Sequence, residues 1–210
     1  SIVSSYFLTY LVHNLTKDKK IVIKRFVGKR LSDKDIPPFG GLSMSITFLI
    51  STRLLGEASA EIKIISIGCV AIALVGLFDD LFNLSWWKKL LFQFICISIP
   101  IFSSTIVLNI EENLQIDRAN LINNFATFVW VLLIVNSVNF IDNMDGLAAS
   151  VSMLIAIELS ILAFILGQNN LADVAGILGF TIFGFLLMNF PPAKIYMGDS
   201  GSMFLGYCLA

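Results

Sequence analysis

Long apolar stretches recur along the chain, and short polar segments separate them. A helix needs about 20 mostly apolar residues to cross the hydrocarbon core of a bilayer. Hydrophobic residues fill 57% of the 210 positions and charged residues only 14%, too few polar side chains to cover a soluble globule. The sequence therefore predicts an all-α, polytopic bundle of transmembrane helices.

The apolar runs predict seven complete spans and the start of an eighth at residue 203. The seven lie near residues 1–13, 40–55, 62–78, 90–108, 121–141, 147–166 and 171–190. Nothing in the sequence indicates a soluble domain, so we interpret residues 1–210 as one integral membrane domain. The chain starts with Ser and stops inside an apolar run, so we expect a fragment of a longer protein.

Basic residues are distributed unevenly between the predicted loops. One alternate set of loops holds 11 of the 14: Lys17, Lys19, Lys20, Lys24, Arg25, Lys29, Arg30, Lys34, Lys88, Lys89 and Lys194. The opposite set holds Arg53, Lys63 and Arg118. Because basic residues are retained on the cytoplasmic side, the first set is predicted to face the cytoplasm.

Three polar clusters adjoin the predicted helices: residues 76–80, 136–146 and 189–202. Two crossings separate each cluster from the next, so all three are predicted to reach the same face as the basic loop 17–34. Carboxylates gathered at one surface repel each other, and a hard divalent cation with oxygen ligands relieves this repulsion. The clusters therefore predict Mg²⁺, with Mn²⁺ as an alternative, and a phosphate or diphosphate substrate.

Each cluster taken singly has an ordinary structural alternative. Asp79 and Asp80 are compatible with a helix end in water, and Asn139 to Asp145 with a capped helix terminus before a turn at Gly146. Asp199 is compatible with a capping residue of the eighth helix. Their joint placement on one face favours a functional site.

Four motifs carry a resemblance to a known family. They are Pro37-Pro-Phe-Gly-Gly41, Asp79-Asp80 followed by Lys89-Leu-Leu-Phe-Gln93, Asn139-Phe-Ile-Asp-Asn-Met-Asp-Gly146 and Lys194-Ile-Tyr-Met-Gly-Asp-Ser-Gly-Ser202. In this order they resemble the polyprenyl-phosphate N-acetylhexosamine-1-phosphate transferases, glycosyltransferase family 4, which include phospho-N-acetylmuramoyl-pentapeptide transferase. The segment 189–194 is most similar to the branch that initiates O-antigen.

The resemblance implies a role for each matching residue. It implies that Asp199 is a magnesium ligand, and that Asp79 and Asp80 act at the lipid phosphate as catalytic residues and further metal ligands. It implies that the ring of Tyr196 stacks on uracil. The predicted substrate-binding residues are Asn139, Asp142, Asp145, Asn189, Tyr196, Gly198, Lys89 and Lys34.

The chain departs from the family pattern at two places. Many relatives carry a histidine about where Ser32 stands, which leaves the binding role of this loop open. The late histidine-rich cytoplasmic loop, with its neighbouring helices, is missing from the chain.

The implied reaction transfers an N-acetylamino-sugar-1-phosphate from a UDP-sugar to undecaprenyl phosphate and releases UMP. It is expected in a bilayer, at the cytoplasmic face of the bacterial inner membrane, with no nucleic-acid partner and with a homodimer as one compatible assembly. Direct attack by the lipid phosphate is preferred to a covalent adduct on Asp79 or Asp80, since a phosphate monoester's second pKa of about 6 leaves the lipid largely dianionic. The sugar stays open.

Two other functions remain as alternatives. An ion-coupled transporter also carries intramembrane acids, but its site is expected near the midplane, whereas these clusters end helices. A truncated, inactive remnant is the second. Glu158, near the middle of the sixth helix, is expected to face other helices and to find a partner or stay protonated.

Overall fold

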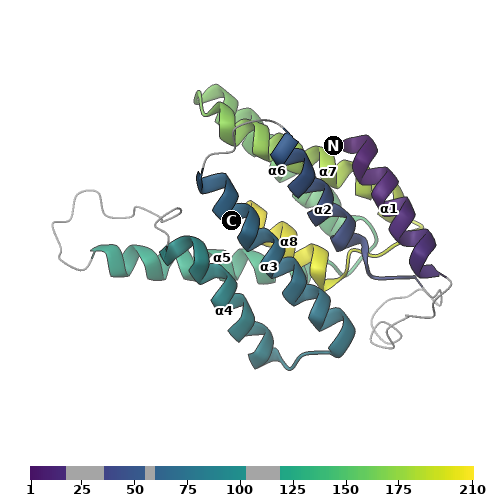
Figure 1. The fold of residues 1–210 in the computed structure, drawn as a ribbon, viewed down its shortest axis with the longest axis horizontal. Helices are drawn as coiled ribbons and strands as arrows, with labels where there is room; N and C mark the ends of the chain where they lie inside the picture. The colour runs from purple at the N-terminus through teal and green to yellow at the C-terminus, as the bar shows by residue number, and fades with distance from the viewer. Residues whose placement is uncertain (18–35, 55–59, 103–118) are drawn as a thin grey trace.

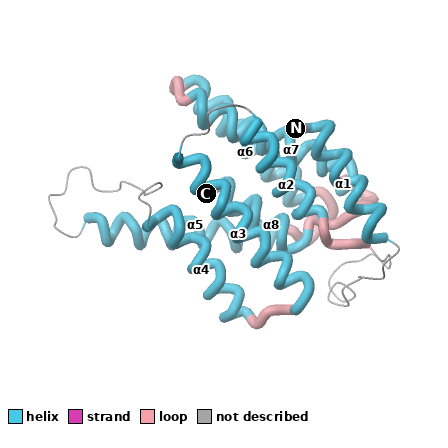
Figure 2. The backbone as a smooth tube through the Cα atoms, viewed as in Figure 1, coloured by secondary structure: helices cyan, strands magenta, loops and turns pink. Residues whose placement is uncertain are grey.

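The structure is a computed structural model that describes residues 1–17, 36–54, 60–102 and 119–210. Within these residues the chain is helical and has no strand (Figures 1 and 2). The helices are α1 (Ile2–Lys17), α2 (Gly40–Leu54), α3 (Ala60–Phe82), α4 (Trp86–Phe102), α5 (Ala119–Ile141), α6 (Leu147–Ile165), α7 (Asn169–Asn189) and α8 (Gly198–Leu209). Lys34 and Ser32 lie outside the described residues.

Four of the described helices are long and apolar enough to cross a membrane. These are α3, α5, α6 and α7, with spans of 19 to 21 residues. The described parts of α1, α2 and α4 have 16, 15 and 17 residues. Large apolar side chains cover the outer surface of the helices, as on α4, where Leu91, Phe94 and Ile95 are exposed. The predicted polytopic helical membrane fold is confirmed.

Helix α8 lies in the middle of the described bundle. It packs against α2, α3, α5 and α6, and every residue from Ser200 to Tyr207 is buried. It begins at Gly198, five residues before the predicted start at 203. The first turn of α8, Gly198-Asp-Ser-Gly-Ser202, is polar, so a search for apolar runs places the start of the helix too late. Contacts with other helices keep this turn helical.

Glycine and proline mark the C-terminal ends of α6 and α7. Gly167, with φ 74°, follows the last turn of α6, and its N–H donates to the carbonyl of Phe164. At the other end, Phe190 is extended because Pro191 follows it, and α7 ends there. The loop between α7 and α8 is thereby directed across the end of the bundle.

The expectation for Glu158 was wrong. Its side chain is exposed on the surface of α6 rather than packed against other helices. Helix α6 buries a stripe of small residues, including Ser152, Ala156 and Ala163. Glu158 lies two positions after Ala156, which places it on the opposite side of the helix.

Candidate functional site

Four polar side chains from four helices meet at one end of the bundle. The Lys89 Nζ lies 3.0 Å from Asp79 Oδ2 and 2.9 Å from Asp199 Oδ2. It also donates to Asn139 Oδ1 at 3.2 Å. Asp79 lies in the last turn of α3, and Asn139 in the last turn of α5. Lys89 lies in the first turn of α4, and Asp199 in the first turn of α8. Residues from all three predicted polar clusters therefore converge, as the count of helix crossings predicted.

Each carboxylate of this group is also held by a second donor. The backbone N–H of Leu84 donates to Asp79 Oδ1 at 2.9 Å, which fixes this carboxylate at the α3–α4 turn. Asn139 Nδ2 donates to Asp199 Oδ1 at 3.0 Å and to Ser202 Oγ at 2.7 Å. Both carboxylates thus have one oxygen fixed and direct the other oxygen, Oδ2, at Lys89.

Opposite charges keep Asp199 and Lys89 ionised. Burial opposes the charged form of Asp199, but its contact with Asp79 and the ammonium group of Lys89 outweigh that effect, so the pKa of Asp199 lies below its usual range. Burial likewise opposes the charge on Lys89, yet the carboxylate of Asp199, followed by that of Asp79, holds the pKa of Lys89 above its usual value. The Lys89–Asp199 ion pair is therefore charged at neutral pH.

Asp80 has a different environment from its neighbour Asp79. Its buried carboxylate accepts the backbone N–H groups of Asp199 at 3.0 Å and Ser200 at 3.1 Å. These two N–H groups belong to the first turn of α8, where a helix has no internal acceptors for them and favours a negative charge. Asp80 therefore joins the end of α3 to the start of α8.

Two glycines allow this close junction. A Cβ atom on Gly76 would lie 2.4 Å from the carbonyl oxygen of Asp199, so only glycine lets α3 and α8 approach here. Gly198 has φ 73°, and a Cβ atom there would lie 2.3 Å from the carbonyl oxygen of Pro38. Gly198, predicted as a substrate-binding residue, lies beside Asp80 at the start of α8.

Two of the sequence motifs pair through their backbones. The N–H groups of Gly40 and Gly41 donate to the carbonyls of Tyr196 and Met197, both at 2.9 Å, and Tyr196 donates back to Pro37 at 3.0 Å. The side chain of Tyr196 is only 3% exposed. Its predicted stacking on uracil requires an accessible ring face, and it stays a prediction.

The remaining predicted residues lie around the α5–α6 turn. The Asn189 side chain accepts the Gly146 N–H at 3.1 Å and donates to the Ile195 carbonyl at 2.9 Å. Asp145 Oδ2 accepts the Ala193 N–H at 3.1 Å. Asp142 directly follows the end of α5, so it does not continue the helical face of Asn139. Asp145 and Asn189 thus hold the α7–α8 loop against this turn.

Three further polar residues complete the cluster, and sequence reasoning quoted them within its motifs without assigning them a role. Gln93 and Asn136 exchange side-chain amide contacts at 3.1 and 3.5 Å between α4 and α5, and Gln93 is fully buried. Ser202 accepts from Asn139. The signal was spacing: Gln93 follows Lys89 by four residues, and Asn136 precedes Asn139 by three, so each pair shares a helix face.

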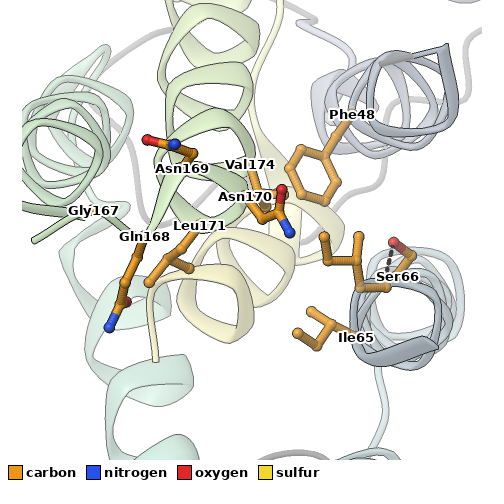
Figure 3. A pocket seen from close by; sticks show the side chains of 10 residues that line it. Phe48, Ile65, Ser66, Gly167, Gln168, Asn169, Asn170, Leu171 and Val174 are labelled. Atoms are coloured by element: carbon orange, nitrogen blue, oxygen red, sulfur yellow. Dashed lines mark hydrogen bonds between the residues drawn. The ribbon is translucent and has the colours of Figure 1, made fainter. Parts of the chain in front are cut away.

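A cavity of about 620 Å³ opens at the opposite end of the bundle (Figure 3). It lies between the first turns of α3, at Ile65 and Ser66, and the α6–α7 turn, at Gln168 to Asn170. None of its lining residues is charged. Despite its volume, this cavity offers no group for phosphate chemistry, so the candidate site is the charged cluster.

The charged cluster fits magnesium by its chemistry. Two carboxylates and one amide oxygen, from Asp79, Asp199 and Asn139, already surround one cationic group, the Lys89 ammonium. In the described part of the chain, no group of three or more His, Cys, Asp or Glu side chains forms a closed metal site. Mg²⁺ suits such a set, since it binds one or two carboxylates and completes its shell with water and substrate phosphates.

Fold and site together define a multi-pass helical membrane protein with its charged groups at one end of the bundle. The chain belongs to glycosyl transferase family 4, whose profile matches residues 62–210. That match includes Asp79, Lys89, Asn139 and Asp199.

Individual relatives agree with this family. The chain is 30% identical over 186 residues to a Bacillus subtilis protein named "probable undecaprenyl-phosphate N-acetylglucosaminyl 1-phosphate transferase", covering 87% of this chain and 52% of the relative. It is 31% identical over 206 residues to the undecaprenyl-phosphate alpha-N-acetylglucosaminyl 1-phosphate transferase of Thermotoga maritima, covering 98% and 60%. A 71-residue segment is 46% identical to a phospho-N-acetylmuramoyl-pentapeptide-transferase of Moorella thermoacetica, covering 34% and 22%. The chain thus spans only 52% and 60% of the first two relatives.

Proposed function

We propose that the full protein is a polyprenyl-phosphate N-acetylhexosamine-1-phosphate transferase at the cytoplasmic face of the bacterial inner membrane. An oxygen of the lipid phosphate attacks the sugar-bearing phosphorus of a UDP-sugar. The bond from that phosphorus to the bridging oxygen breaks, and UMP leaves with the electron pair. The observation that carries the proposal is the convergence of Asp79, Lys89, Asn139 and Asp199 at one end of a membrane bundle.

In this proposal the protein acts mainly by positioning charge. Asp79 and Asp199 would hold Mg²⁺, and the bound ion would supply neutralisation of charge on the diphosphate. Asn139 orients Asp199 through its hydrogen bond, and Asp80 fixes the turn of α8 from which Asp199 projects. The fixed carboxylates keep the attacking and leaving oxygens in line at little cost in entropy.

The attacking group needs little activation. A phosphate monoester has a second pKa of about 6, so the lipid phosphate is largely dianionic at neutral pH. Direct attack is therefore preferred to a covalent adduct on Asp79. A single-turnover reaction without lipid acceptor separates the routes, because UMP release under those conditions requires the adduct.

The proposed substrates are a UDP-N-acetylamino sugar and undecaprenyl phosphate. The names of the relatives support the lipid and the amino sugar, and the segment 189–194 supports a role in starting O-antigen or a related glycan. The nucleotide-sugar is proposed to bind at the loops beside the charged cluster. The residues at these loops are Asp142, Asp145, Asn189 and Tyr196.

The decisive experiment supplies the full-length protein in lipid nanodiscs with candidate UDP-sugars, undecaprenyl phosphate and Mg²⁺, and measures UMP release. Asp199→Asn is expected to lower turnover by about 10²–10³-fold, the range for losing one key charge-stabilising group. Asp173→Asn, at an exposed position near the opposite end of α7, is the matched control. Near-normal turnover in Asp199→Asn contradicts the proposal, and solute uptake without UMP release favours the transporter.

A further inference from the structure

The ammonium group of Lys89 has an acceptor for each of its three N–H bonds. The acceptors are Asp79 Oδ2, Asp199 Oδ2 and Asn139 Oδ1, at 2.9 to 3.2 Å. They come from three different helices, and the side chain is only 15% exposed. An ammonium ion can donate no more than three hydrogen bonds, so this position is saturated.

The same two carboxylate oxygens are the ones a metal ion would need. The other oxygen of each carboxylate is already fixed, Asp79 Oδ1 by Leu84 and Asp199 Oδ1 by Asn139. A cation that bridges Asp79 and Asp199 therefore meets both Oδ2 atoms at the point where the Lys89 ammonium lies. Two cations cannot occupy that point together.

We propose that Lys89 is exchanged for the divalent cation: its ammonium holds the two carboxylates in place before metal binds and leaves them when metal arrives. The proposal rests on the magnesium site of the proposed function. Without Lys89, two carboxylates on a shared point repel each other. The long flexible stem of lysine allows the ammonium to move while α4 stays in place.

The exchange has a consequence for the order of binding. Exchange of the ammonium group for a divalent cation places one more positive charge between Asp79 and Asp199, and this favours binding of a diphosphate. Lys89, once released, is available to donate to the substrate's phosphate oxygens. Metal therefore binds before the nucleotide-sugar.

The first test measures Mn²⁺ binding to the full-length protein by electron paramagnetic resonance, without substrate. Lys89→Met keeps the length of the side chain and removes its charge, and it is expected to bind Mn²⁺ on the order of tenfold more tightly because a competing cation is gone. Lys88→Met is the matched control, because Lys88 is exposed and lies over the Trp87 ring, 5.4 Å from its centroid. Unchanged or weaker binding in Lys89→Met overturns the exchange.

The second test uses the unaltered protein, so it does not depend on how a variant folds. A water-soluble amine reagent, with mass spectrometry of the modified peptides, compares Lys89 and Lys88 with and without Mg²⁺. Faster modification of Lys89 in Mg²⁺, at a constant rate for Lys88, supports the exchange; equal or slower modification of Lys89 contradicts it. Neither measurement needs turnover. If UMP is not released, the proposed function is contradicted, and the Mn²⁺ binding and lysine modification still test the exchange.

Discussion

Two adjacent carboxylates at the end of α3 have separate roles in the structure. Asp79 points to Lys89, and Asp80 accepts the first two N–H groups that α8 presents to it. Consecutive helix residues point about 100° apart, so the side chains of these two neighbouring acids leave α3 in different directions. The sequence predicted both as metal ligands and catalytic residues; the geometry favours Asp79 for the metal and Asp80 for positioning α8.

We expect Asp80→Ala to destabilise the protein. Two backbone N–H groups lose their acceptor inside the bundle, where Asp80 is 1% exposed. A buried donor left without an acceptor costs about 1–3 kcal/mol, so the free energy of unfolding is expected to fall by roughly 2–3 kcal/mol. Denaturation in mixed micelles measures this change.

The control for this variant is Asp173→Ala, because Asp173 is exposed. Asp80→Asn retains one acceptor oxygen and is expected to recover part of the lost stability. If Asp80→Ala unfolds like the unaltered protein, Asp80 does not hold α8.

At the level of elements, α3 and α8 form a close antiparallel-type contact along their lengths. Gly76 meets the first turn of α8, and near the other end Cys69 Sγ lies 3.2 Å from Cys208 Sγ. Both thiols are free in the structure. Sequence analysis did not predict this proximity, because the two cysteines are 139 residues apart.

We expect mild oxidation with diamide to link Cys69 and Cys208. Diamide takes up the two thiol hydrogens and is reduced to a hydrazine, and the sulfurs form a disulfide with little movement of either helix. Mass spectrometry of non-reduced peptides identifies the linked pair. Cys69→Ser and Cys208→Ser are expected to lose it, and no linkage in the unaltered protein contradicts the α3–α8 packing.

The helices themselves were largely predictable, since long apolar runs have few other solutions in a bilayer. Three features were not. The first turn of α8 is polar and depends on Asp80 from another helix. We expected Glu158 to face other helices because a carboxylate is costly to place in lipid. The stripe of small residues on α6 instead decides which side of that helix is buried. Asp142 falls just beyond the end of α5, and helix ends are the least predictable positions.

At the level of the whole molecule, the predicted meeting of the acidic clusters followed from counting crossings. Asp79, Asn139 and Asp199 lie at the same end because an even number of helices separates them. Counting cannot say which side chains touch, so the central place of Lys89 and the support from Gln93 and Ser202 came only from the structure.

The uneven distribution of basic residues between the loops predicts the orientation of the protein in the membrane. Lys88 lies at the end that carries the charged cluster, and Arg53 lies at the end of α2 on the far side. In a variant whose native cysteines are replaced by Ser, Lys88→Cys is expected to react with a membrane-impermeant maleimide only after the cell is made permeable. Arg53→Cys is expected to react in intact cells, and the reverse pattern contradicts the cytoplasmic site.

The central position of α8 also bears on biogenesis. Seven of the described helices precede it in the chain, and they carry Asp79, Asp80, Lys89 and Asn139. Asp199 follows them, on a helix that packs against four of them. During synthesis the carboxylates of α3 therefore enter the membrane before the interior of the bundle is filled, and the charged cluster is complete only once α8 is in place.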